Sequence, residues 1–234
     1  MEPIEINGGF NPNGGAHNED EVEAVNIQDL VNTPEQPQGP DVFLNQAAQR
    51  PRFVVAVCGT SGAQRLFNLL YAFVPYAGIA VVVTRSAAKI MDCSHIPGVP
   101  IFTDEFQWSS WLALGENISE KLCAWAQLVV VVPASSNTLT KIALGLSDNL
   151  LTTVVKSYLG PVFLVPDMSP EMWMNPVTGQ RVQELVARGY SVMDPPSVAQ
   201  EGEPQLPPLI GPMDDTPGNV VNWVMNNFDP HGQN

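Results

Sequence analysis

Residues 53–73 read FVVAVCGTSGAQRLFNLLYAF, and this stretch decides the fold of the chain. It begins with a nearly continuous apolar run ending in glycine, which is typical of a strand buried on both faces of a sheet. A Gly-Thr-Ser-Gly loop follows at residues 59–62, and apolar residues then recur at helical spacing from Leu66 to Phe73. A strand, a tight loop and a helix in this order predict the first unit of an α/β domain.

The same alternation of strands and helices continues along the chain. Apolar runs predict strands at 78–84, 126–135, 160–168 and 189–194, and helical spacing predicts helices at 137–155, 176–188 and 220–228. Continuously apolar strands that alternate with helices indicate a parallel sheet with helices on both faces. Because crossover connections of this kind are right-handed, we expect a doubly wound parallel sheet, Rossmann-like or flavodoxin-like.

The composition divides the chain into four parts. Residues 1–51 contain nine acidic residues and few apolar anchors, which predicts a disordered acidic tail. The α/β pattern occupies residues 52–196, the predicted ligand-binding domain. Residues 197–228 predict an irregular flap segment and a closing helix, and residues 229–234 a polar tail. The acidic tail is either a solvated spacer or a segment that binds a protein partner.

The charge and the cysteines argue against several classes of protein. The 234 residues carry a formal net charge of −14, which repels nucleic acid and anionic membrane surfaces. No apolar run reaches the roughly 18 residues that a membrane span needs, and no signal peptide is recognisable. Cys58, Cys93 and Cys123 show neither disulfide nor metal-site spacing, which favours a cytoplasmic protein without a metal centre.

Three predicted strand ends carry small hydroxyl residues directly before a helix. They are residues 59–62, Thr84–Ser86 and Pro133–Thr138. Helix N-termini at the carboxyl edge of such a sheet suit a phosphate, and hydroxyl groups add donors without bulk. Ordinary turns with capping side chains show the same residue types, and Ser86 is the predicted cap of a helix that begins at Ala87. The three loops together favour a nucleotide or flavin phosphate without naming the ligand.

Three motifs resemble those of the flavin-containing cysteine decarboxylases, the family of phosphopantothenoylcysteine decarboxylase and the halotolerance flavoproteins. Residues 133–152, PASSNTLTKIALGLSDNLLT, resemble the PASANT motif and the CDNLL segment of that family. Residues 103–111 resemble its TDxxEW segment, and residues 165–176 resemble its PAMNxxMWxNP motif. The resemblance extends over residues 53–196 and implies a flavodoxin-like fold, bound FMN and a trimer, with identical subunits or mixed family members.

The resemblance also implies which residues hold FMN. The positions that bind FMN in the family correspond to residues of the three hydroxyl-rich loops and to one residue beyond the 160–168 strand: Thr60, Ser61, Gly62, Thr84, Ser86, Ser135, Ser136, Asn137, Thr138 and Asp167. Asp167 stands where the family has alanine next to the flavin. A carboxylate at that position is expected to repel an anionic reduced flavin and to weaken or retune its binding.

The positions that carry the family's chemistry hold other residues in this chain. The family histidine corresponds to Ser119, counted back from Trp125, and the asparagine of PAMN corresponds to Ser169. A serine hydroxyl is not a base near neutral pH unless a partner activates it. The flap cysteine of the pantothenate branch has no counterpart, because residues 197–212 contain no cysteine. Ser119 and Ser169 are therefore candidate catalytic positions that lack the family side chains.

These departures leave the question of enzymatic activity open. One hypothesis is an FMN-binding, decarboxylase-like protein that acts as a non-catalytic subunit or regulator related to coenzyme A biosynthesis, as in the mixed trimers of fungal relatives. The alternative is an active FMN-dependent decarboxylase that forms 4′-phosphopantetheine, with Glu116 or Glu120 in place of the histidine. A third hypothesis is an unrelated α/β binding module whose motif matches are coincidental.

Overall fold

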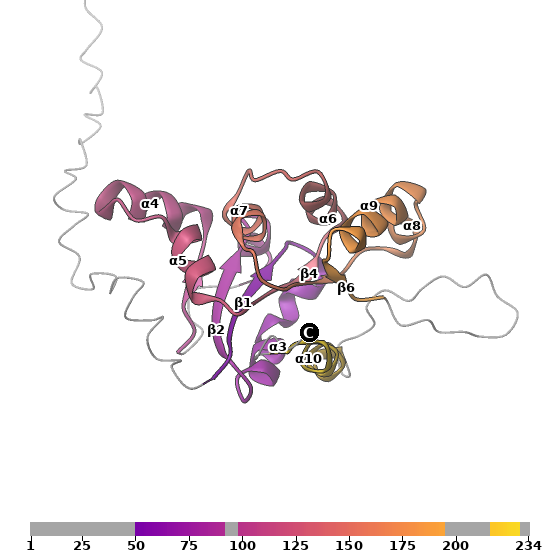
Figure 1. Ribbon diagram of the computed structural model, residues 1–234, viewed down its shortest axis with the longest axis horizontal. Coiled ribbons are helices and arrows are strands. Elements are labelled where there is room, and N and C mark those ends of the chain that lie inside the picture. The colour runs from indigo at the N-terminus through magenta and orange to yellow at the C-terminus, as the bar shows by residue number, and fades with distance from the viewer. Residues whose placement is uncertain (1–49, 92–97, 195–215, 230–234) are drawn as a thin grey trace, which may run out of the picture. The chain divides into compact units, whose positions relative to one another are not determined.

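The computed structural model describes residues 50–91, 98–194 and 216–229, and within them six parallel strands form one sheet (Figure 1). The chain enters at the centre, extends the sheet to one side, and then crosses back to extend it on the other side, in the order β3-β2-β1-β4-β5-β6. This confirms the predicted doubly wound parallel sheet. The strands are β1 (Arg52–Val57), β2 (Gly78–Val83), β3 (Ile101–Phe102), β4 (Leu128–Ala134), β5 (Val162–Pro166) and β6 (Ser191–Val192).

Two hydrophobic clusters, one on each face of the sheet, fix the helices in place. Alternate residues of a strand point to opposite faces, so Phe53 and Val55 join one cluster while Val54 and Ala56 join the other. The first cluster includes side chains of α3 (Leu66–Phe73) and α10 (Thr216–Asn227). The second includes side chains of α5 (Ile118–Trp125), α6 (Ser136–Ala143), α7 (Leu150–Ser157) and α9 (Pro176–Ala187). The two groups of helices lie on opposite sides of the sheet (Figure 1).

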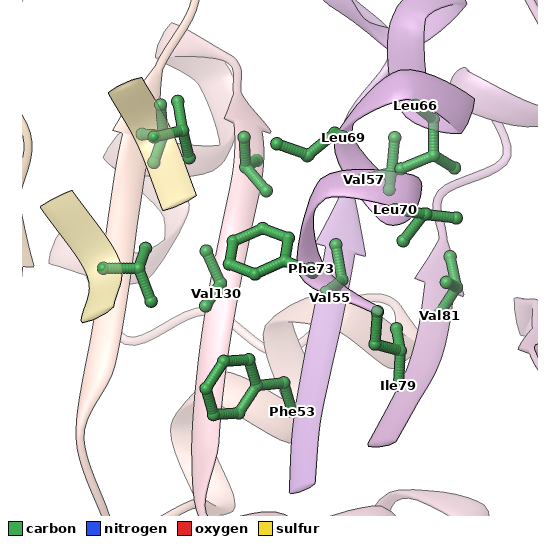
Figure 2. Close-up of a cluster of buried hydrophobic side chains, with 14 of the residues drawn as sticks. Phe53, Val55, Val57, Leu66, Leu69, Leu70, Phe73, Ile79, Val81 and Val130 are labelled. Atoms are coloured by element: carbon green, nitrogen blue, oxygen red, sulfur yellow. The ribbon is translucent and has the colours of Figure 1, made fainter. Parts of the chain in front are cut away.

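The packing of α3 on the sheet positions the loop that precedes it. Figure 2 shows Leu66, Leu69 and Leu70 above the strand residues of the first cluster, next to Phe73. The rings of Phe53 and Phe73 meet edge to face, with their centroids 6.0 Å apart. Full burial of each such side chain stabilises the fold by roughly 1.5–3 kcal/mol. The short 3₁₀ helix η2 (Ser61–Arg65) runs directly into α3, so this packing also anchors residues 59–62.

The predicted helix at 137–155 is wrong as a single element, because the structure divides it into α6 and α7. Gly145 has a positive φ of 69° and ends the first of these helices. Asn149 then starts α7 with a reciprocal capping box: its side chain accepts from the Thr152 N–H, and the Thr152 hydroxyl accepts from the Asn149 N–H. The break brings Asp148 and Asn149 to the carboxyl edge of the sheet.

The structure also contains elements that the hydrophobic pattern did not predict. These are the two-residue strand β3, the helices α4 (Asp104–Leu114) and α5, and the short helix α8 (Pro170–Trp173). The predicted disordered tail, apart from residues 50–51, and the irregular segment up to residue 215 lie outside the described residues. Among the helices of the described ranges, none has both the length and the apolar character needed to cross a membrane.

Candidate functional site

A pocket of about 440 Å³ opens where β1, β2 and β4 end. It lies at the point where the chain turns from one half of the sheet to the other, the usual place for a ligand in this architecture. Its volume falls in the range of small-molecule sites. The lining residues come from the ends of β1, β2 and β4, from the start of α4, from α6 and from the break before α7: Cys58, Gly59, Thr84, Arg85, Ser86, Asp104, Ser135, Asn137, Thr138, Lys141, Asp148 and Asn149.

The start of α6 contributes a set of linked hydroxyl groups to this pocket. The Ser135 hydroxyl oxygen accepts from the Thr138 N–H at 3.2 Å and so caps the helix. Ser135 also donates to Thr138 Oγ1 at 3.1 Å, and the Cys58 thiol approaches the same oxygen at 3.1 Å. These contacts fix Ser135 and Thr138, while Asn137 remains exposed at the pocket. The first N–H groups of an α-helix lack intrahelical acceptors, so this end of α6 favours an anion.

Thr84 takes the capping role that the sequence assigned to Ser86. The Ala87 N–H donates to Thr84 Oγ1 at 3.3 Å, and the Thr84 hydroxyl donates to the Val57 carbonyl at 3.1 Å. Ser86 is the residue directly before the 3₁₀ helix η3 (Ala87–Lys89), but its side chain makes no capping hydrogen bond. The side-chain cap predicted for Ser86 is therefore wrong, because Thr84 already satisfies that N–H. Ser86 is instead exposed and lines the pocket.

Charged side chains of both signs surround the pocket. Lys141 pairs with Asp148 at 2.5 Å, which links α6 to the segment before α7. The hydrogen bond from Lys141 lowers the pKa of the Asp148 carboxyl. Asp104, at the start of α4, accepts from the Leu150 N–H at 2.7 Å and so occupies the N-terminus of α7. An anionic ligand is therefore favoured at the hydroxyl groups and the N-terminus of α6, which an uncharged serine caps, over the N-terminus of α7, where Asp104 lies.

The cysteine in the pocket is not poised as a nucleophile. Cys58 is buried, and burial raises the pKa of its thiol, with the hydrogen bond to Thr138 acting weakly in the opposite direction. The thiolate is the reactive form of cysteine, so Cys58 stays protonated and unreactive near neutral pH. Cys58 contributes to the site by packing and by the hydrogen bond of its thiol to Thr138.

Residues 60–62 of the glycine-rich loop do not line the pocket and have a different environment from Gly59. Asp167, which is only 5% exposed, accepts hydrogen bonds from the Thr60 hydroxyl and, at 2.9 Å, from the Gly62 N–H. Gly59 must be glycine, since a Cβ there would lie 2.5 Å from the Ser86 Cβ. The structure thus separates the predicted FMN positions into a pocket group and a group around Asp167.

The candidate catalytic positions Ser119 and Ser169 do not line the pocket. Ser119 is buried in α5, and its hydroxyl donates to Asn117 Oδ1 at 2.7 Å. The Asn117 amide in turn donates to Glu120 at 2.8 Å, while Glu116 pairs with Lys121. Ser169 is the N-cap of α8 and accepts from the Met172 N–H at 3.3 Å. Each serine has a local structural role, and Ser169 also forms a hydrogen bond with the exposed carboxylate of Glu171.

The sequence reasoning located part of the pocket and missed the rest. Thr84, Ser86, Ser135, Asn137 and Thr138 all line it, whereas Thr60, Ser61, Gly62, Ser136 and Asp167 do not. The missed lining residues are mainly charged or amide side chains: Arg85, Asp104, Lys141, Asp148 and Asn149. Asp104 lies within residues 103–111, and Asp148 and Asn149 lie within residues 133–152, so those motifs carried a signal for them.

Comparison with known proteins identifies the family. The model of the Flavoprotein family matches residues 44–223. The phosphopantothenoylcysteine decarboxylase HAL3 of Malus domestica is 36% identical over 169 residues, covering 70% of this chain and 79% of the relative. A phosphopantothenoylcysteine decarboxylase of Arabidopsis thaliana is 36% identical over 159 residues, covering 66% and 76%. The solved structure of the FMN binding protein AtHal3 superposes with a TM-score of 0.67 at 31% identity, covering 77% of this chain and all of that one. This chain therefore belongs to the flavoprotein family that includes the flavin-containing cysteine decarboxylases.

Proposed function

We propose that this chain binds FMN and acts as a non-catalytic subunit or regulator related to coenzyme A biosynthesis. Its relatives include phosphopantothenoylcysteine decarboxylases and an FMN binding protein. The proposal that the chain is non-catalytic rests on the environment of Ser119, whose hydroxyl is buried and donates to Asn117. A hydroxyl held as a donor to an amide oxygen has no means of taking a proton from a substrate.

The pocket residues fit the phosphate of FMN. Thr84, Ser86, Ser135 and Thr138 offer hydroxyl groups from the ends of β2 and β4, the two strands that flank β1, and α6 begins at the end of β4. Lys141 adds a cation within the lining. Hydroxyl groups and a helix N-terminus bind phosphate without steric bulk, which supports FMN as the ligand. When bound, FMN would supply an electron acceptor for the oxidation of a cysteine-derived substrate.

The residues considered as replacements for the family histidine are either outside the described ranges or engaged in other contacts. The three histidines of the sequence, His17, His95 and His231, lie outside the described residues. Glu120, a predicted stand-in, accepts a hydrogen bond from Asn117 and has no resolved contact with the pocket. The other, Glu116, is paired with Lys121 at 2.7 Å. These contacts support the non-catalytic reading over an active decarboxylase.

We further propose that the protein works as part of a trimer with its own kind or with other family members. Trp108, Trp111 and Leu112 of α4 are exposed by 63%, 56% and 78%. Their spacing places them on one side of the helix. An exposed apolar surface of this kind marks a contact with another protein. The predicted acidic tail remains a second candidate for partner binding, and the unpaired Cys58 and Cys123 support a cytoplasmic location.

The test is an absorption spectrum of the purified protein, followed by anaerobic addition of phosphopantothenoylcysteine. We expect flavin absorption that does not bleach when the substrate is added, because FMN binds and no residue drives the decarboxylation. Bleaching with release of carbon dioxide would show that the chain is an active decarboxylase. A protein that neither carries FMN nor binds it on addition would contradict the FMN part of the proposal.

A further inference from the structure

The buried carboxylate of Asp167 is fixed in place by the sheet. Asp167 directly follows β5, and its backbone N–H donates to the Ala134 carbonyl at the end of β4 at 2.9 Å. The side chain then reaches toward the end of β1, where Oδ2 accepts from the Thr60 hydroxyl and from the Gly62 N–H. Three strand ends thus contribute to a single carboxylate site. A carboxylate buried to this degree needs such donors to offset its lost hydration.

Several donors in and next to the glycine-rich loop are engaged within the chain itself. The Thr60 N–H donates to the Cys58 carbonyl at 3.0 Å, and the Ala63 N–H donates to the Thr60 carbonyl at 3.1 Å. The Gly62 N–H is directed at Asp167 Oδ2. Because these groups are already engaged, they are not available to a second anion at the turn.

The loop also fits closely around the carboxylate. A Cβ added to Gly62 would lie 2.7 Å from Asp167 Oδ2 and 3.4 Å from both Asp167 Cγ and the Pro133 Cβ. No atom of a separate phosphate fits between Gly62 and Asp167 while these contacts persist. The close approach requires glycine at position 62 for the same reason.

We propose that Asp167 is an intramolecular ligand of the glycine-rich loop, which excludes a phosphate or other external anion there and weakens the binding of FMN. The carboxylate competes for the Thr60 and Gly62 donors and repels a second negative charge. The phosphate is then restricted to the pocket group of residues around Ser135. This inference rests on the proposed function, because FMN is the main probe. Inorganic phosphate is a second probe, and its result does not depend on whether the chain binds FMN.

The test compares the full-length wild-type protein with Asp167→Ala and Asp167→Asn. Titration with FMN, followed by quenching of flavin fluorescence, should show an affinity about tenfold higher for Asp167→Ala, since both the competitor and its charge are removed. Asp167→Asn keeps the shape and removes only the charge, so it should show a smaller gain. Glu184→Gln, which makes the same change in net charge on α9 away from the pocket, should bind like the wild type.

A second measurement, thermal stabilisation by inorganic phosphate, tests the proposal without FMN. Inorganic phosphate should raise the melting temperature of Asp167→Ala more than that of the wild type or Glu184→Gln, at constant ionic strength, because a new anion site is available. Unchanged or weaker FMN binding by a folded Asp167 variant, with no gain in the phosphate effect, would overturn the proposal. If no variant binds FMN but phosphate stabilises Asp167→Ala selectively, the proposed function fails and this inference stands. If Asp167→Ala does not fold, the same two measurements on Asp167→Asn decide.

Discussion

The hydroxyl of Ser119 lies 2.7 Å from Asn117 Oδ1, and the carboxylate of Asp167 accepts the N–H of Gly62 at 2.9 Å. Both side chains are hydrogen-bonded to other residues of the chain, and neither lines the pocket. The fold accommodates the polar groups of Ser119 and Asp167 because each has a hydrogen-bond partner. At the scale of single residues, these hydrogen bonds are compatible with the fold, but they reduce the number of groups that are available to a ligand.

A pH-dependent stability follows from Tyr158, the residue that ends α7. Its hydroxyl donates to the Ala126 carbonyl at 3.3 Å, and burial is the main cause that raises its pKa to about 12. The pKa of tyrosine in an unfolded chain is about 10, so the folded state favours the neutral phenol. The resulting stability is fully present below pH 10 and is lost as the pH rises from 10 to 12. At pH 11 the loss amounts to about 1 kcal/mol.

The measurement is urea unfolding of the wild type and of Tyr158→Phe between pH 8 and about pH 11. We expect the free energy of unfolding to fall more steeply with pH in the wild type, since only that protein carries the phenol. Parallel curves for the two proteins would show that ionisation of Tyr158 is not coupled to folding.

At the scale of elements, the strands were easier to predict than the helices. The strands of the sheet centre are continuous apolar runs, and both faces of β4 are buried along its whole length. The helix α4 carries no such signal, because Ser110 is its only buried residue while Trp108 and Trp111 are exposed. The two-residue strand β3 is too short to show any period. The division between α6 and α7 depended on Gly145, whose meaning became clear only from its positive φ.

The site was predictable to the extent that it depends on local sequence. Hydroxyl residues that follow a strand and precede a helix mark Ser135 and Thr138 without knowledge of the fold. The ion pair of Lys141 with Asp148 depends on the helix break, and the contact of Asp167 with Thr60 joins positions 107 residues apart. Long-range contacts of this kind follow from tertiary packing, which a single sequence does not reveal.

The cap of α6 gives a prediction at this scale. Ser135→Ala removes the acceptor of the Thr138 N–H and the hydroxyl that supports Thr138 Oγ1. The free energy of unfolding should fall by about 1 kcal/mol in a urea titration, the usual cost of losing a helix cap. The matched control is Ser136→Ala, one residue further on, which should change stability by less than about 0.5 kcal/mol. Equal effects of the two variants would contradict the capping role of Ser135.

At the scale of the whole molecule, the charge and the exposed apolar residues act in opposite directions. A formal net charge of −14 keeps copies of the chain apart, and nine of the 24 acidic residues lie before residue 50. The side chains of Trp108, Trp111 and Leu112 favour association, because covering them removes apolar surface from water.

The assembly prediction tests this balance. Trp108→Glu combined with Trp111→Glu places two charges on the exposed side of α4, and burying them in an interface is strongly unfavourable. Light scattering coupled to gel filtration should show the mass of a trimer for the wild type and of a monomer for the double variant. Leu159→Glu is the control, because Leu159 is 99% exposed on another part of the surface and its variant should remain assembled. A monomeric wild type, or a double variant that keeps the mass of the wild type, would show that α4 is not the contact between subunits.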